Sequence, residues 1–361
     1  MNRRLPAIMA LVALAACAPD DTAERPGTEG PAVPLSSIRL EPQDSGTDVL
    51  LQTVSAVDEN VVWVSGHGGT WARTLDGGET WAARVMEGAD SLQFRDVHAL
   101  DADRAWLLSA GPGELSRIYR TRDGGETWDL QFLNPEPDGF YDCIEFRDAE
   151  HGLAYGDAVD GELRILRTRD GGETWEYTRT ADVPPALAGE GGFAASGTCV
   201  ALGPGGRAWI GTGASDTARV LSTRDGGRTW TATASPLLGG EAAGIFTIAF
   251  RDSLHGTILG GDLARPEDHT DNVAVTADGG ATWTLSGRPV FAGAVYGAAY
   301  VPGAPTPTVV AVGPNGADWS ADEGQTWASA DTLSYWGLGI ASSGAGWLVG
   351  PEGRIARISF E

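Results

Sequence analysis

The sequence predicts an all-β fold built from a repeated four-stranded unit, and three observations predict it. One eight-residue phrase occurs six times, as TRDGGETW at 121–128 and 168–175 and as close variants at 74–81, 223–230, 276–283 and 320–327. Its aspartates recur every 44 to 55 positions, the limits being Asp278 to Asp322 and Asp170 to Asp225. Glycine (51 residues) and tryptophan (13) are abundant, which suits many short strands joined by tight turns. A repeat of about 45 residues with four strands is the pattern of a β-propeller blade.

One repeat, residues 139–180, shows how each unit supplies its strands. FYDCIEF is a short strand-like run, HGLAYG is a second one bounded by glycine, and ELRILRT alternates in polarity. Asp-Gly-Gly then signals a turn, and Thr174-Trp175 begins a fourth strand. The unit is therefore expected to be a four-stranded antiparallel meander.

The repeated phrase is predicted to form the hairpin between the third and fourth strands. Its aspartate can accept backbone N–H groups, its glycines permit the reversal, and its tryptophan covers apolar surface. The structural pairs are Asp76/Trp81, Asp123/Trp128, Asp170/Trp175, Asp225/Trp230, Asp278/Trp283 and Asp322/Trp327.

Seven repeats can be aligned, and the last one is incomplete. First strands are expected to begin at Leu51, Phe94, Phe140, Ser196, Gly244, Ala294 and Ser334. The last repeat stops after three strands, so SIRLE (37–41) is expected to supply its outer strand and close the ring. The sequence therefore predicts one seven-bladed β-propeller of four-stranded antiparallel blades over residues 36–361.

The repeated phrase resembles the Asp-box, or bacterial neuraminidase (BNR) repeat, S/T-x-D-x-G-x-T-W. Beyond it, the stretches 140–161, 189–200 and 244–263 resemble seven-bladed propellers related to the photosystem II stability/assembly factor. Bacterial members carry loose labels such as oxidoreductase or glycosyl hydrolase. The resemblance implies a propeller fold and a binding or assembly role. The acidic character of this chain argues against a photosystem role, since photosynthetic members are expected to offer an arginine-rich face.

The amino-terminal segment has the features of an export signal. Arg3 and Arg4 precede the apolar run 5–16, and Leu14-Ala15-Ala16-Cys17 resembles the bacterial lipobox, in which the cysteine is lipidated. The alternative is an ordinary signal peptide with a chance cysteine. Residues 1–17 are thus predicted to be a lipoprotein signal and 18–35 a disordered tether. We expect an extracytoplasmic lipoprotein, with Ala18 favouring the outer membrane.

Charge and motif content exclude several functions. The net charge is −24 and the sequence contains no lysine, so nucleic acid is not expected as a partner. The sequence has no Walker loop, no G-x-G-x-x-G, no G-x-S-x-G and no H-E-x-x-H motif. No cofactor is therefore expected, and we expect a monomer.

A ligand is expected at the top face, the face at which the first strands begin. Aligned first strands predict a ring of Thr53, Asp96, Asp142, Thr198, Phe246, Tyr296 and Trp336 at the channel mouth. Its polar and aromatic residues suit a protein, glycan or small organic ligand. The alternative is that the aromatic residues simply fill the channel.

Carboxylates from neighbouring blades are predicted to converge on the same face. Asp142, Asp157, Glu190 and Asp262 lie at first-strand starts or top loops, and the loop containing Glu190 and Ser196 is small and polar. Such carboxylates could bind Ca²⁺ or form an acid/base pair for glycoside hydrolysis, or they could be a solvated acidic rim.

Two function classes follow. The first is a non-catalytic propeller lipoprotein that binds a partner or acts in assembly. The alternative is a sialidase-like or other glycoside hydrolase that uses Asp142, Glu190 and Tyr141, although the arginine triad that sialidases need is not found. Cys143 and Cys199 occupy equivalent positions in neighbouring repeats, where they are either bonded or simply buried.

Overall fold

The computed structural model describes residues 1, 35–268 and 271–361. The predicted lipidation site Cys17 lies outside the described residues, as do the signal segment beyond Met1 and the tether up to residue 34. Within the described part of the chain, no helix has the length and apolarity needed to cross a membrane.

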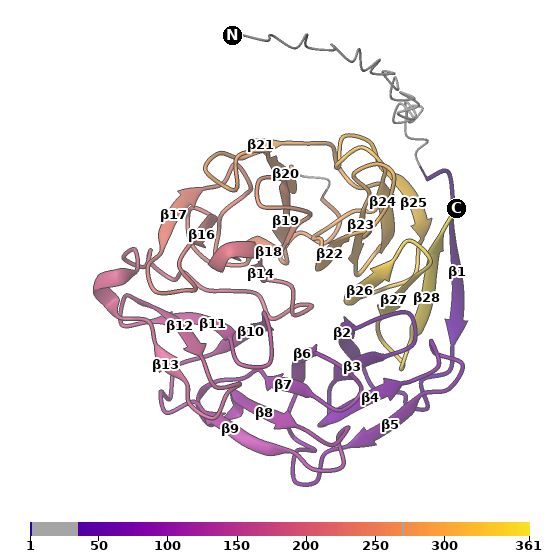
Figure 1. Cartoon of the computed structure of the whole chain (residues 1–361), viewed down its shortest axis with the longest axis horizontal. Coiled ribbons are helices and arrows are strands. Elements are labelled where there is room, and N and C mark those ends of the chain that lie inside the picture. Colours follow the sequence, from indigo (N-terminus) through magenta and orange to yellow (C-terminus); the bar gives the residue numbers. More distant parts are fainter. Residues whose placement is uncertain (2–34, 269–270) are drawn as a thin grey trace. The chain divides into compact units, whose positions relative to one another are not determined.

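Seven four-stranded antiparallel sheets form a ring, which confirms the predicted seven-bladed propeller (Figure 1). Blade one consists of β2 (Leu51–Ala56), β3 (Val62–Gly66), β4 (Thr70–Thr74) and β5 (Ala82–Val85). Blade two consists of β6 (Phe94–Ala99), β7 (Ala105–Ser109), β8 (Arg117–Thr121) and β9 (Asp129–Leu133). Blade three consists of β10 (Tyr141–Phe146), β11 (Gly152–Val159), β12 (Glu162–Thr168) and β13 (Glu176–Tyr177).

The remaining blades repeat this order. Blade four consists of β14 (Val200–Leu202), β15 (Ala208–Gly211), β16 (Arg219–Thr223) and β17 (Thr231–Ala234). Blade five consists of β18 (Ala243–Phe250), β19 (Gly256–Asp262), β20 (Val273–Thr276) and β21 (Thr284–Leu285). Blade six consists of β22 (Gly297–Tyr300), β23 (Val309–Gly313), β24 (Gly316–Ser320) and β25 (Ala328–Asp331). Blade seven consists of β26 (Gly337–Ser342), β27 (Ala345–Val349), β28 (Ile355–Phe360) and β1 (Ile38–Gln43). Helical structure in these residues is limited to short 3₁₀ turns at Gly113–Leu115, Thr180–Asp182 and Pro204–Gly206.

The ring is closed by the amino-terminal strand, as predicted. Strand β1 pairs antiparallel with β28, with Ile38 opposite Phe360 and Gln43 opposite Ile355. Blade seven therefore contains both ends of the propeller domain, and no incomplete blade is left with an exposed edge.

Each repeated octapeptide forms the hairpin between the third and fourth strands of its blade. In blade one, the Asp76 carboxylate accepts hydrogen bonds from the Thr80 backbone N–H (2.9 Å), the Thr80 hydroxyl (2.6 Å) and the Thr74 hydroxyl (2.7 Å). The same contacts recur at Asp123, Asp170, Asp225, Asp278 and Asp322. These hydrogen bonds stabilise the ionised carboxylate and lower the pKa of Asp76 to about 2, and the bond from the Thr80 hydroxyl has the largest effect.

Buried apolar side chains lie between the blades. The described residues form seven hydrophobic clusters, and each cluster joins one pair of adjacent blades. Trp106 of β7 stacks on Phe146 of blade three, with ring centroids 3.7 Å apart, and its indole N–H donates to the Gly171 carbonyl in the next hairpin (2.9 Å). Trp209 repeats both contacts in blade five, with Phe250 (3.6 Å) and Gly279 (2.8 Å). Each blade thus hides its apolar face against its neighbour.

The tryptophans of the six hairpins pack against these clusters, but they are not the most deeply buried indoles. Trp230 and Trp283 are buried, and the other four are only partly buried, namely Trp81, Trp128, Trp175 and Trp327. Each of the six contacts a different cluster. The fully buried tryptophans belong instead to second strands and are Trp63, Trp106, Trp209 and Trp347. The hairpin tryptophans thus cover apolar surface, as the sequence predicts, but the deepest burial falls to second-strand tryptophans, which lie outside the repeated phrase.

The hairpin indoles make two kinds of contact, hydrogen bonds and edge-to-face aromatic contacts. Three donate their N–H group to a nearby oxygen: Trp81 to Gln43 Oε1 (3.1 Å), Trp230 to the Gly227 carbonyl (3.1 Å) and Trp327 to the Gly324 carbonyl (3.0 Å). The other three meet an aromatic ring edge to face, Trp128 with Trp71 (5.6 Å), Trp175 with Phe146 (5.8 Å) and Trp283 with Phe250 (6.0 Å), measured between centroids. These contacts place all six side chains in structural roles within their blades.

β-Bulges interrupt four of the first strands near their beginnings. The register shifts between Leu51 and Thr53, Phe94 and Asp96, Tyr141 and Cys143, and Ile245 and Thr247. The bulged residues are Gln52, Arg95, Asp142 and Phe246. Thr53 and Asp96 are therefore level with Cys143 and Thr247, one residue further along their strands than Asp142 and Phe246, with which the sequence alignment grouped them.

Candidate functional site

The top of the channel is closed by residues 190–198, which we call the plug loop. The Gly192 N–H donates to Asp157 of blade three (2.9 Å), and the Ser196 hydroxyl donates to the Tyr296 carbonyl of blade six (2.7 Å). The side-chain amide of Gln52 in blade one reaches the Ala195 carbonyl (3.4 Å). Since the loop bonds to blades on opposite sides of the ring, it spans the channel. Strand β14 accordingly begins at Val200 and not at Ser196 as expected.

Glycines allow the plug loop to lie directly against buried carboxyl groups. A Cβ atom at Gly197 would lie 2.2 Å from Asp96 Oδ1, and one at Gly191 would lie 2.0 Å from Asp157 Oδ1. Gly197 also has φ +74°, a conformation that L side chains rarely adopt. The small residues predicted to admit a ligand instead admit the loop itself.

Aromatic residues of the predicted ring continue this closure. Phe193 of the plug loop lies 3.9 Å from Phe246, which lies 6.1 Å from Tyr296, and Tyr296 lies 5.0 Å from Trp336, all between ring centroids. Phe246 is fully buried, whereas Tyr296 and Trp336 are half-buried. The row agrees with the alternative in which the aromatic residues fill the channel.

Asp142 and Asp157 lie together beneath the plug loop. Asp142 is 1 % exposed, and burial followed by the charge of Asp157 raises its pKa well above the ordinary value. Burial also raises the pKa of Asp157, although its carboxylate accepts the Gly192 N–H. The pair is therefore held in a protonated form to a higher pH than two isolated carboxyls.

Glu190 joins this buried cluster but already has a full set of partners. Its carboxylate accepts two bonds from Arg219, at 2.8 Å from Nε and 2.5 Å from an Nη atom, and one from the Thr212 hydroxyl (2.8 Å). The Leu187 N–H also donates to it (2.9 Å). The carboxylate is thus anchored at the base of the plug loop, with its side chain shielded from solvent.

The other predicted residues are spread over different environments. Asp96 is buried and accepts the Ile144 N–H (2.7 Å), while Thr198 donates to the hydroxyl of Thr247 (2.8 Å). Asp262 caps a turn at Ala264 and pairs with Arg265 on an outer loop. Tyr141 is buried against Phe132. The structure therefore brings Asp142, Asp157 and Glu190 together beneath the plug loop and places Asp262 apart.

The two kinds of aspartate predict opposite pH dependences of stability. The pKa of Asp142 is raised above 3.8, so its contribution is present at low pH and is lost as the pH rises through the raised value. The pKa of Asp123 is lowered to about 2, so its contribution is lost as the pH falls from 3.8 to about 2. We expect Asp142→Asn to flatten only the decline on the alkaline side and Asp123→Asn to flatten only the acid decline. Urea unfolding from about pH 2 to about pH 9 measures both. An Asp142→Asn profile parallel to wild type above about pH 5 would contradict this assignment.

Cys143 and Cys199, for which the sequence allowed either a disulfide or two separate buried thiols, are joined in a disulfide with Cα atoms 6.0 Å apart. Cys199 directly follows the plug loop, and Cys143 directly follows Asp142. The bond therefore fastens the end of the plug loop to the neighbouring blade at the level of the carboxyl cluster.

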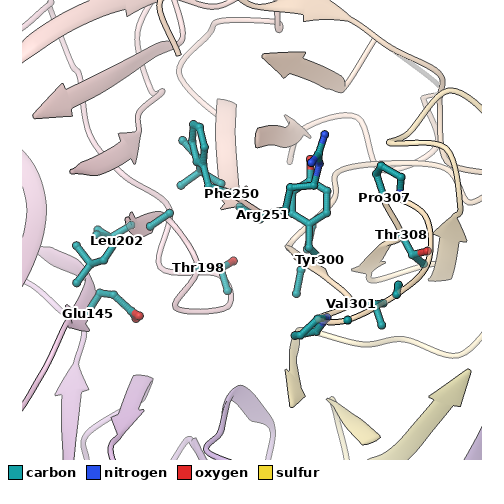
Figure 2. A pocket seen from close by; sticks show the side chains of 18 of the residues that line it. Glu145, Thr198, Leu202, Phe250, Arg251, Tyr300, Val301, Pro307 and Thr308 are labelled. Atoms are coloured by element: carbon teal, nitrogen blue, oxygen red, sulfur yellow. The ribbon is translucent and has the colours of Figure 1, made fainter. Parts of the chain in front are cut away.

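The open part of the channel lies on the other side of the plug loop, toward the bottom face that carries the hairpins. Two cavities of about 620 and 460 Å³ share Glu145, Gly197 and Thr198 in their walls, and we call them together the basin. Figure 2 shows Thr198 lying between Glu145 and Leu202 on one side and Tyr300 and Val301 on the other. The basin is thus a dead-end recess with the plug loop as its floor.

All seven first strands line the basin, and we call the set of lining residues at one equivalent position of these strands the channel ring. Its members, in blade order, are Ser55, His98, Glu145, Ala201, Ala249, Ala299 and Gly339. Sequence reasoning missed them because it placed the site at the beginnings of these strands. A signal was present, since each is the middle residue of VSA, VHA, IEF, VAL, IAF, AAY or LGI near its strand's end.

The described residues contain no group of three or more His, Cys, Asp or Glu side chains placed to hold a metal ion. Calcium binding at the top-face carboxylates remains a prediction.

No family model matches the chain, and none of the curated proteins is detectably similar to it. Solved structures do resemble it. YCF48 bound to D1 peptide has a TM-score of 0.64 at 18% identity, covering 92% of this chain and 99% of that one. YCF48 from Cyanidioschyzon merolae has a TM-score of 0.61 at 18% identity, over 89% and 98%. The GH74 xyloglucanase from Xanthomonas campestris has a TM-score of 0.62 at 15% identity, over 89% of this chain but 53% of the enzyme. The predicted resemblance to assembly-factor propellers is thereby confirmed at the level of the fold.

Proposed function

We propose that this chain is a non-catalytic binding propeller that holds a peptide segment of a partner protein. The observation that carries the proposal is the dead-end channel, since the two cavities of its basin, about 620 and 460 Å³, each fall within the range of about 300–1,000 Å³ usual for ligand pockets. The likeness to a propeller solved with a bound D1 peptide supports a peptide as the ligand. Attachment through a lipidated Cys17 would hold this monomeric module at the bacterial cell envelope.

The environment of the candidate catalytic residues supports binding over hydrolysis. Asp142 and Glu190 are each 1 % exposed, and Tyr141 is fully buried. A glycosidase needs two carboxyls that flank the sugar, about 5–5.5 Å or 6.5–9.5 Å apart, with access to substrate. A carboxylate already bound by Arg219 and covered by the plug loop is poorly suited to that role.

The proposal is tested by comparing binding and turnover with the full chain in detergent. We expect it to retain peptides from a random-sequence peptide array and to release no reducing sugar from xyloglucan or sialyllactose. Sugar release that Asp142→Asn and Glu190→Gln both abolish would replace the proposal by the hydrolase alternative. Failure to retain any peptide would reject peptide binding.

A further inference from the structure

We propose that the basin is the ligand site and that it selects a peptide segment in which an apolar side chain lies next to a basic one. This inference rests on the proposed peptide-binding function and assigns it to the bottom face. It differs from the top-face site expected from the sequence.

The volume of the basin comes from small residues in one half of the channel ring. Blades four to seven contribute Ala201, Ala249, Ala299 and Gly339, whereas blades two and three contribute His98 and Glu145. All of these residues occupy equivalent strand positions, so a large side chain in blades four to six would project into the same space. The basin therefore exists because these positions are small.

The small-residue half has an apolar wall. Phe250 and Tyr300 line it together with the segment 301–307, VPGAPTP, which contains three prolines. Figure 2 shows Tyr300, Val301 and Pro307 on the side of the cavity opposite Leu202 and Glu145. This wall can remove an apolar side chain from water.

The arginine beside this wall is already neutralised. Arg251 Nε lies 2.9 Å from Glu323 Oε1, and an Nη atom lies 3.0 Å from Asp252 Oδ2. Tyr300 also donates its hydroxyl to Glu323 (3.1 Å). Glu323 adopts φ +61° at the hairpin position that is glycine in the five other copies, so this network persists despite local strain.

The opposite half of the basin carries a carboxylate that lacks such compensation. Glu145 is one-third exposed, and its Oε2 lies 3.2 Å from His98 Nδ1. Among the described residues, Glu145 forms no ion pair with an arginine. Arg147 at the rim directs its guanidinium to the Arg207 carbonyl (2.9 Å).

These charges favour a basic ligand group. The formal charge of −24 supports the same preference, because it attracts cationic partners toward the protein. An apolar side chain would then pack on the apolar wall, and a neighbouring ammonium or guanidinium group would pair with Glu145.

The experiment measures fluorescence anisotropy of labelled hexapeptides with the full chain in detergent at low salt. The probes are alternating leucine and lysine, alternating leucine and glutamate, and alternating serine and lysine. We expect the leucine–lysine peptide to bind at least about tenfold more tightly than either of the others, because only it matches both halves of the basin.

Three variants locate the binding. Glu145→Gln is expected to weaken leucine–lysine binding about tenfold, and Ala249→Trp is expected to abolish it by filling the basin. Glu79→Gln removes the same charge from an exposed hairpin position outside the basin and should leave affinity unchanged. An Ala299→Phe variant repeats the blocking test from blade six, and circular dichroism with thermal unfolding shows which variants are folded.

Several outcomes overturn the inference. Equal binding of the leucine–glutamate peptide rejects the charge selection. If Glu79→Gln and Glu145→Gln weaken leucine–lysine binding equally, the preference comes from the overall charge of the protein and not from the basin. Binding that survives in folded Ala249→Trp and Ala299→Phe places the ligand elsewhere and leaves the proposed function intact. Retention of no peptide in the array rejects the proposed function itself.

Discussion

Replacing Trp106 by alanine is expected to lower the free energy of unfolding by about 3–5 kcal/mol, as large-to-small changes of buried aromatic residues do. Trp106 is fully buried, stacks on Phe146 and bonds to the Gly171 carbonyl, and the guanidinium of Arg120 lies 5.2 Å from its ring. Phe146, Gly171 and Arg120 would all lose their contact with the indole at once. The cavity would lie between blades two and three, where the ring depends on continuous contact.

Urea unfolding monitored by circular dichroism measures this change, and two variants serve as controls. Trp106→Phe keeps an aromatic ring against Phe146 but loses the bond to Gly171, so it should cost clearly less. Leu75→Ala alters a side chain that is 53% exposed and should stay within about 0.5 kcal/mol of wild type. A Trp106→Ala midpoint close to that of Leu75→Ala would show that this contact between blades does not support the ring.

Replacing Arg219 by methionine is expected to cost about 3–5 kcal/mol, because it leaves the buried Glu190 carboxylate without its counter-ion. The two side chains are 12% and 0% exposed and form a bidentate pair. The remaining donors, the Thr212 hydroxyl and the Leu187 N–H, are neutral and cannot replace the guanidinium charge. The plug loop should therefore lose its anchored first residue.

A double variant separates the loss of a partner from the loss of the pair. Arg219→Met with Glu190→Leu removes both charges, so it should be more stable than Arg219→Met alone in urea unfolding. Arg39→Met breaks an exposed pair with Glu41 and should cost no more than about 1 kcal/mol. A single variant as stable as the double one would show that the Glu190 carboxylate is not held as a charge.

The hairpins were predictable because their determinants are local. Thr74, Asp76 and Thr80 fall within one turn, and their hydrogen bonds need no distant partner. Ring closure was also predictable. The seventh repeat lacked its fourth strand, so the amino-terminal strand β1 had one open edge with which to pair. The depth of burial of each tryptophan was not, because it depends on which strand of the neighbouring blade lies against it.

The candidate site was predictable only in part. The sequence grouped Asp142, Asp157 and Glu190 correctly from their positions at strand ends, but it also included Asp262, which lies on a separate loop. It aligned Asp96 with Asp142, although Asp142 lies in the bulge of its strand and Asp96 lies directly after the equivalent bulge. A bulge depends on contacts across the sheet and leaves no fixed mark in the sequence.

The sequence by itself determined the number of blades, the hairpin that ends each third strand and the strand that closes the ring. These features follow from short-range turn chemistry and from repetition of one apolar pattern. Only the tertiary structure decided that residues 190–198 cross the channel and that the open basin lies on the hairpin side. That outcome rests on contacts between residues as far apart as Gln52 and Ala195, or Ser196 and Tyr296, which meet only once all seven blades are in place.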